Sequence, residues 1–309
     1  MGISLSEIAR ALRGKVVGNQ VLAPGPNHST KDQSLSVRLS AGSPDGFIVF
    51  SHAGDDFRTC RDYVADALGL SADRWRQERP LDPAEEARRR VARQQSEAKE
   101  IADTARRQRR AVAIWQEAGD PHGTIVETYL RSRSLDLPED IAGEVLRFHP
   151  RCPFGEGTTA PVMVAAMRCV HTGEIVGIHR TALTLDGAKV GRKMFGTATA
   201  AAIMLDGEDT VLSGLSVGEG IESCLAARQL GIRPTWALGS TANIAAFPVL
   251  DGVEALTLLG EKGDGGASDR ACAAAGTRWH AAGRAVDIVL PKIGGDLNDV
   301  VLGGAQTWL

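Results

Sequence analysis

The sequence predicts an α/β fold whose main part is a four-stranded parallel sheet flanked by helices. Between residues 212 and 299, apolar runs of about five residues alternate with helix-like segments, as in the βαβ units of a parallel sheet. Acidic residues stand just past these apolar runs: Glu219, Glu261, Asp264, Asp296 and Asp299. Because loops at the carboxyl ends of parallel strands meet at one crevice, we expect these carboxylates to face each other.

Carboxylates that are brought together repel one another unless a cation lies between them. Mg2+ takes oxygen ligands and keeps part of its water, so Mg2+ or Mn2+ is the ion that this arrangement predicts. Three of these acids also have a purely structural interpretation. Glu219 can sit at the positive end of a helix, Asp264 can be a turn residue, and Asp299 is favourable near a helix start.

Length and composition set the frame for the rest of the chain. The 309 residues allow two or three structural parts, and a hydrophobic content of 43% supports a real core. A net charge of −3 argues against a uniformly basic surface but is compatible with a local basic groove. No apolar run is long enough to span a membrane, and the N-terminus has no apolar signal region. We therefore expect a cytoplasmic protein with no membrane association.

The five cysteines are scattered through the sequence and form no Cys-x-x-Cys pair. This spacing fits neither a zinc site nor a disulfide framework, so free thiols are expected.

Residues 1–70 are predicted to form a small α+β module. Its expected elements are a helix, two strands and a second helix, at residues 4–12, 35–39, 46–51 and 57–68. Ser4 and Glu7 have the spacing of a capping box at the start of the first helix.

Residues 71–118 are predicted to be a helical linker. From Glu85 onward the sequence runs to residue 118 without Gly or Pro, and thinly spaced apolar residues recur at heptad positions. Between Glu85 and Arg110 there are nine basic and five acidic residues. Such a segment is either a solvated connecting helix or a basic helix that contacts phosphates, with residues 106–110 as its most basic part.

Residues 119–204 are predicted to form a separate small α/β unit. Residues 124–133 have the pattern of a helix, and residues 162–170 and 175–183 alternate like the two strands of a hairpin. A basic, Gly-rich turn is predicted to follow at residues 186–196.

The segment GEGIES, followed by a strand that ends in acidic residues and Gly, and then by DLND, resembles the Toprim domain. This domain is shared by bacterial-type primases, topoisomerases and some nucleases, and the likeness is closest to phage- and plasmid-type primases. It places a Toprim domain at residues 205–309. The first motif matches Glu219, and the second, Asp-x-Asp followed by Gly, is altered to Glu261-Lys262-Gly263-Asp264. The third acidic position falls on Asp296 or Asp299.

The front of the chain is similar to the zinc-ribbon module of the same primases. Gly25-Pro26-Asn27-His28 stands where that module has Cys-Pro-x-His, and residues 51–56 stand at its Cys-x-x-Cys hairpin. A structural zinc ion needs four Cys or His ligands, and only His28 and His52 are candidates, so no zinc is expected. The two histidines can equally be ordinary polar loop residues. A functional alternative is contact with a nucleic-acid strand by Lys31, Arg38 and Arg58.

The resemblance also implies that the unit of residues 119–204 is the basic subdomain that holds the template strand. Its basic residues would then line a groove that leads to Glu219: Arg168, Arg180, Lys189, Arg192 and Lys193. The structural alternative is an ordinary hairpin with exposed basic side chains.

The function that the resemblance implies is primer synthesis in DNA replication: Mg-dependent nucleotidyl transfer from nucleotides onto a primer on single-stranded DNA. Glu219 would be a base or metal ligand, and the metal ions would be held by Glu261, Asp264, Asp296 and Asp299. The altered second motif keeps two alternatives open, a Toprim nuclease and a catalytically degenerate DNA-binding protein of a mobile element. The sequence has no GxxxxGK[ST] loop, so any helicase would be a separate polypeptide.

Overall fold

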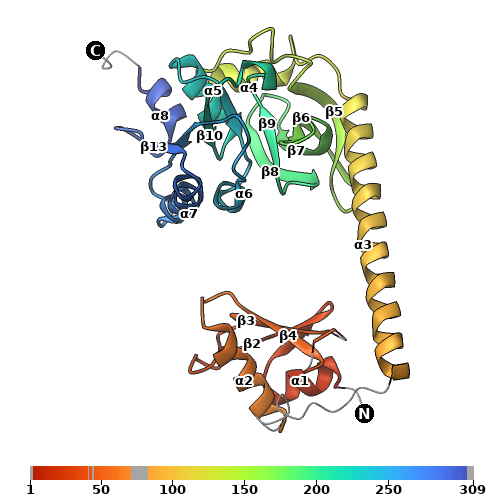
Figure 1. The fold of residues 1–309 in the computed structure, drawn as a ribbon. Coiled ribbons are helices and arrows are strands. Elements are labelled where there is room, and N and C mark those ends of the chain that lie inside the picture. Colours follow the sequence, from red (N-terminus) through yellow and green to blue (C-terminus); the bar gives the residue numbers. More distant parts are fainter. Residues whose placement is uncertain (1–2, 41, 44, 71–82, 305–309) are drawn as a thin grey trace. The chain divides into compact units, whose positions relative to one another are not determined.

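The structure is a computed structural model that describes residues 3–40, 42–43, 45–70 and 83–304. The chain forms two compact units, residues 1–100 and residues 101–309 (Figure 1). In the part of the chain that the structure describes, no helix has both the length and the apolar character needed to cross a membrane.

The N-terminal unit contains an antiparallel four-stranded sheet in the order β1-β2-β3-β4. Its elements are α1 (Leu5–Ala11), β1 (Lys15–Val17), β2 (Gln20–Ala23), β3 (Leu35–Leu39), β4 (Phe47–Ser51) and α2 (Phe57–Ala67). Both predicted helices and both predicted strands are confirmed, and Ser4 and Glu7 form the expected capping box. The helices cover one face of the sheet, where Ile8, Val37 and Val64 are fully buried. Strands β1 and β2 were not predicted.

Helix α3 (Pro83–Glu117) is the long helix that the sequence predicts. Only its carboxyl end is packed in the second unit, where Ala111, Ile114 and Trp115 are buried against the sheet. Ile101, which falls on the predicted apolar seam, is exposed. The apolar seam therefore belongs to a helix that is largely solvated along its middle.

The second unit is built on one nine-stranded sheet. The strand order is β13-β12-β10-β11-β9-β6-β7-β8, with β5 paired to β6. The strands are β5 (Leu146–Gly155), β6 (Thr158–Cys169), β7 (Ile175–Leu183), β8 (Lys189–Gly196), β9 (Ala201–Met204), β10 (Gly214–Gly218), β11 (Thr235–Ala237), β12 (Ala255–Leu259) and β13 (Ala285–Val289). We call β5 to β9 the antiparallel half and β10 to β13 the parallel half.

The parallel half confirms the predicted four-stranded parallel sheet, because β10 runs parallel to β11 and β12, and β12 to β13. Its helices are α5 (Ile221–Gln229), α6 (Thr241–Ala246), α7 (Ala267–Ala281) and α8 (Leu297–Leu302). One apolar core contains residues of α5, α8 and the preceding helix α4 (Ile125–Ser132). A second core contains residues of α6 and α7. The helices thus cover both faces of the sheet (Figure 1).

The two halves share a continuous sheet, although the sequence pattern suggested separate units. Strand β9 pairs antiparallel with β11 on one side and with β6 on the other. The predicted hairpin over residues 162–170 and 175–183 is confirmed as β6 and β7. This continuity places β8, at the far edge of the antiparallel half, in a rigid relation to the parallel half.

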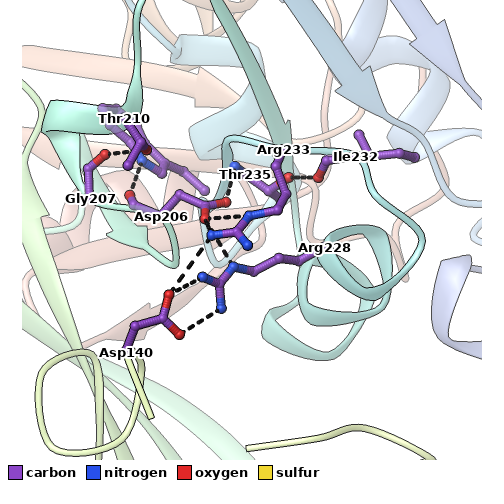
Figure 2. Close-up of polar contacts among 9 residues, drawn as sticks. Asp140, Asp206, Gly207, Thr210, Arg228, Ile232, Arg233 and Thr235 are labelled. Atoms are coloured by element: carbon purple, nitrogen blue, oxygen red, sulfur yellow. Dashed lines mark hydrogen bonds and ion pairs between the residues drawn. The ribbon is translucent and has the colours of Figure 1, made fainter. Parts of the chain in front are cut away.

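A buried ion-pair network also joins the halves (Figure 2). Asp206, just after β9, has a side chain that is only 1% exposed. It accepts hydrogen bonds from Arg228 Nε at 2.9 Å, Arg233 Nε at 2.8 Å and the backbone N–H of Thr235 at 2.8 Å. The guanidinium of Arg228 also donates to Asp140, in the loop after α4. These contacts fix the end of α5 and the start of β11 to the antiparallel half.

Candidate active site

Glu219 lies at the turn from β10 into α5. A Cβ on the preceding Gly218 would meet Cys224 Sγ at 2.8 Å, so only glycine allows the turn to pack this closely on α5. Gly220 is the N-cap of α5, and within the described residues no side chain caps that helix. The Glu219 carboxylate is instead paired with Arg192 of β8, whose Nη2 lies 2.7 Å from Oε1. Glu219 thus lies beside the N-terminus of α5, as its structural interpretation expects, but its hydrogen-bond partner is Arg192 and not a backbone N–H group of the helix.

Three carboxylates come together at the carboxyl edge of the parallel half. Glu261 follows β12, Asp296 begins α8, and the Ser223 hydroxyl lies between them, 3.3 Å from Glu261 Oε1 and 2.9 Å from Asp296 Oδ2. Burial, and then the negative charges of Glu219 and Asp296, raise the pKa of Glu261 to about 7. Glu219, Glu261 and Asp296 thus form one electrostatic group, which we call the acidic cluster.

Sequence reasoning missed a fourth acid beside this cluster. Glu222 is buried on the first turn of α5, where Lys189 Nζ donates to its Oε1 at 2.7 Å and the Tyr129 hydroxyl makes a further bond. Burial alone would raise the pKa of Glu222, but the charge and hydrogen bond of Lys189, with the bond from Tyr129, lower it to about 2. Glu219 and Glu222 are three residues apart at a helix start, and this spacing was the available signal.

His179 of β7 is a second buried group that the sequence did not single out. It is buried near the charges of Glu222, Lys189 and Arg192, and its Nδ1 has no hydrogen-bond partner among the described residues. Burial lowers the pKa of His179 to about 4. The imidazole is therefore neutral at physiological pH.

The structure divides the five predicted basic residues. Lys189 and Arg192 of β8 point toward the acidic residues of the β10–α5 turn. Arg180 of β7 lies directly opposite Lys193 of β8 in the strand register, so their side chains share one face of the sheet. Arg192 is the neighbour of Lys193 along β8 and therefore points to the other face. Arg168 donates to the carbonyl of Gly173 at the hairpin turn, 3.1 Å away. Only two of the five basic side chains therefore contact the acidic residues directly.

Arg180 and Lys193 belong to a cluster with aromatic rings. Arg180 is only 8% exposed, donates to the carbonyl of Pro153 and stacks over Phe195 with 5.3 Å to the ring centroid. Lys193 Nζ donates to the carbonyl of Phe154 at 2.7 Å and lies 4.8 Å from its ring centroid. Arg180 is thus largely enclosed, whereas Lys193 is on the surface.

Asp264 and Asp299 use their carboxylates to hold backbone. Asp264 accepts from the N–H groups of Gly266 at 3.0 Å, Ala267 at 3.2 Å and Ser268 at 2.6 Å, at the start of α7. Asp299 Oδ2 accepts from the Gly295 N–H at 2.7 Å. Both contacts shape the loops that carry Glu261 and Asp296. The contacts of Asp264 are therefore those of a turn residue, as its structural interpretation expects.

The carboxylate oxygens of the acidic cluster are chemically suited to bind a hard divalent cation. Among residues 3–40, 42–43, 45–70 and 83–304, no three or more His, Cys, Asp or Glu side chains are already arranged as metal ligands. The cluster nevertheless offers only carboxylate oxygens, which Mg2+ and Mn2+ accept. Burial is the main cause of the raised pKa of Glu261, and the negative charges of Glu219 and Asp296, which a bound cation would offset, add to it. The donor set therefore fits the ion, although the ligand geometry is not preformed.

Comparison with known families matches the parallel half to a known domain model. Residues 214–306 match the model of the Toprim domain, and residues 105–205 match the model of a domain of unknown function, DUF7146. The protein therefore contains a Toprim domain, and its parallel sheet is of the Toprim type. No curated protein sequence matches the chain.

Several solved primase structures match parts of this chain at TM-scores below 0.5. A DNA primase domain from Pseudomonas aeruginosa is 16% identical, with 60% of this chain and 69% of that chain covered and a TM-score of 0.44. The Aquifex aeolicus primase, zinc-binding and RNA polymerase domains, is 13% identical, with 98% and 83% covered and a TM-score of 0.43. A DnaG primase catalytic domain bound to single-stranded DNA is 15% identical, with 63% and 74% covered and a TM-score of 0.45.

Proposed function

We propose that this Toprim-domain protein is a primase-like nucleotidyltransferase that extends primers on single-stranded DNA with Mg2+ or Mn2+ as cofactor. The observation that carries the proposal is the placement of the acidic cluster opposite Lys189 and Arg192. Acids on one side and cations on the other form a site for a metal-bound nucleotide, because its phosphates need positive charge and its metal ion needs oxygen ligands.

Glu261, Asp296 and Glu219 are the proposed metal ligands, with Glu219 as ligand or base. A bound divalent cation would neutralise charge on the phosphates of the incoming nucleotide. Asp264 and Asp299 take a supporting part in this proposal, since their bonds to backbone N–H groups position the loops of Glu261 and Asp296.

The residues of the antiparallel half orient the substrate. Arg192 neutralises Glu219 in the structure and is close enough to exchange that carboxylate for a phosphate oxygen. Lys189 is held by Glu222, which fixes its charge beside the cluster. Lys193 and Arg168 are the proposed contacts to the template backbone, and Arg180 supports Lys193 by packing on the same aromatic ring, Phe154.

The test is a template-dependent nucleotide incorporation assay with Mg2+ and with Mn2+, run beside a nuclease assay. Wild-type protein is expected to incorporate nucleotides, and Glu219→Gln is expected to abolish incorporation. Glu254→Gln is the matched control for Glu219→Gln, because it makes the same chemical change at an exposed glutamate. Glu254 precedes β12, at the opposite end of that strand from Glu261 of the acidic cluster. Cleavage without incorporation would establish the nuclease instead.

A non-catalytic nucleic-acid-binding protein is the second candidate. It is favoured by one observation: the Asp264 carboxylate of the altered second motif is bonded to three backbone N–H groups. This candidate predicts DNA binding with no incorporation, no cleavage and no response to divalent cations.

A further inference from the structure

His28 of the N-terminal unit lies between two aspartates. Its Nδ1 is 2.5 Å from Asp32 Oδ2, and its Nε2 is 3.1 Å from Asp55 Oδ1. Asp32 belongs to the loop between β2 and β3, and Asp55 to the loop between β4 and α2. One imidazole therefore joins two loops that are distant in sequence.

Two hydroxyl groups hold these carboxylates in position. Ser34 Oγ donates to Asp32 Oδ2 at 2.7 Å, and Ser51 Oγ donates to Asp55 Oδ2 at 2.8 Å. The His28 side chain is 26% exposed, so the group is partly shielded from water. We call His28, Asp32 and Asp55, with the two serines, the histidine clasp.

The clasp occupies the place where the zinc-ribbon resemblance puts a structural metal. Gly25 stands at one ligand position, and a Cβ there would meet Asp55 Oδ2 at 2.9 Å and His28 Nδ1 at 3.3 Å. The side chains of the clasp thus fill the space into which a ligand at residue 25 would project. The two ring nitrogens face different carboxylates, so they do not converge on one point. These residues do not fit a structural zinc ion.

The geometry requires a particular protonation state. Each ring nitrogen of His28 faces a carboxylate, and only the imidazolium carries a proton on both nitrogens. Loss of one proton would leave a lone pair directed at one of the two acids. The Ser34 hydroxyl lies 3.2 Å from Nδ1, but its proton is directed to Asp32 at the shorter distance of 2.7 Å.

Two other titratable side chains of these loops have partners of their own, since Asp56 caps α2 through Thr59 and His52 Nε2 pairs with Ser36. The thiol of Cys60 on α2 also faces the histidine clasp, and burial, followed by the charges of Asp55 and Asp56, raises its pKa.

We propose that the histidine clasp holds the two loops of the N-terminal unit together in place of a metal ion, and that it loosens when His28 loses its proton. The unit would then be independent of metal but dependent on pH. This proposal rests on the clasp alone and is independent of any activity of the acidic cluster.

The direction of the pH effect follows from proton linkage. The hydrogen bond between His28 and Asp32, together with the charges of Asp55 and Asp32, raises the pKa of His28 despite partial burial. The stabilisation is complete below the ordinary histidine pKa of about 6.5 and is lost as the pH rises through the folded value. Bonds from Ser34 and then His28 lower the pKa of Asp32, so its contribution is present above about pH 4 and is lost in stronger acid. A zinc site would show the opposite trend, because its ligands bind better when deprotonated.

Hydrogen exchange of the full chain tests the proposal. Protection of peptides covering residues 24–34 and 51–56, corrected for intrinsic exchange, should be greater near pH 6 than near pH 8.5. The expected difference is about tenfold for each unit by which folding raises the pKa of His28. Chelator should change nothing. His28→Gln should abolish the pH dependence, whereas His52→Gln, the matched control, should keep it.

Protection that is lost on chelation, or that rises with pH, would overturn the proposal. If His28→Gln does not fold, nitrogen NMR of 15N-histidine-labelled wild-type protein replaces it. The His28 ring should then show two protonated nitrogens at pH values above about 6.5, where an ordinary histidine is neutral. A neutral His28 ring at that pH would equally overturn the proposal.

Discussion

The guanidinium of Arg192 on β8 lies 2.7 Å from the carboxylate of Glu219 at the end of β10. This pair brings a cation of the antiparallel half onto the first acid of the Toprim domain. The neighbouring pair, Lys189 with Glu222, has the same 2.7 Å separation and joins the same two segments. The candidate site is thus formed at the junction of the two halves and belongs to neither one alone.

Divalent cations should stabilise the second unit if the acidic cluster binds them. At a hundredfold excess over Kd, binding contributes about 2.7 kcal/mol, which for a domain of this size is a Tm increase of about 5–11 °C. Glu219→Gln should reduce the shift, and Glu254→Gln should not. A melting temperature that stays constant as Mg2+ or Mn2+ is added to millimolar levels would favour the non-catalytic candidate.

Glu222 should make the second unit sensitive to acid. Its pKa in the folded state is lowered to about 2, so its stabilisation is present above the ordinary glutamate value of about 4.3 and disappears as the pH falls toward 2. Glu222→Gln should lower the unfolding free energy at pH 7 by about 3 kcal/mol, because Lys189 loses its buried partner. It should also flatten the stability profile between about pH 4.3 and 2. Denaturant titrations at several pH values measure both effects, and an unchanged profile would contradict the assignment.

Asp206→Asn should be among the most destabilising conservative changes in the chain. The carboxylate is buried and bonds to Arg228 and Arg233, and removing its charge leaves these cations without a buried partner (Figure 2). The expected loss is about 3–5 kcal/mol by denaturant unfolding. Asp140→Asn is the control, since Asp140 is 60% exposed and its loss should cost about 1 kcal/mol or less. Equal effects of the two variants would contradict the importance of burial.

Binding to single-stranded DNA should weaken with salt, because each phosphate contact releases counterions. Lys193→Gln should reduce the slope of log affinity against log salt by about 0.7 and weaken binding to all sequences alike. Arg270→Gln on α7 is the matched surface control. If combined replacement of Arg180, Arg192 and Lys193 leaves binding unchanged, residues 106–110 of α3 become the next candidates.

Local sequence signals predicted the longest helix and the β6–β7 hairpin, but not the ten-residue strand β5. After its first residue, Pro83, helix α3 contains no Gly or Pro, and the alternating pattern of β6 and β7 identified their hairpin. Strands β1, β2 and β9 escaped prediction because they have only three or four residues, too few to show a period. Strand β8 was read as a basic, Gly-rich turn, since its charged, exposed side chains do not alternate with apolar ones.

The sequence by itself determined that acids follow the strands of a parallel sheet, because that depends only on the order of strands and loops. Tertiary structure decided what each acid does. Tyr129 and Lys189 reach Glu222 from 93 and 33 residues away, and only packing brings them together. His28 likewise meets Asp55 from 27 residues away in the folded unit. Burial and charged neighbours set the ionisation of a side chain, and both are properties of the packed chain that no local pattern contains.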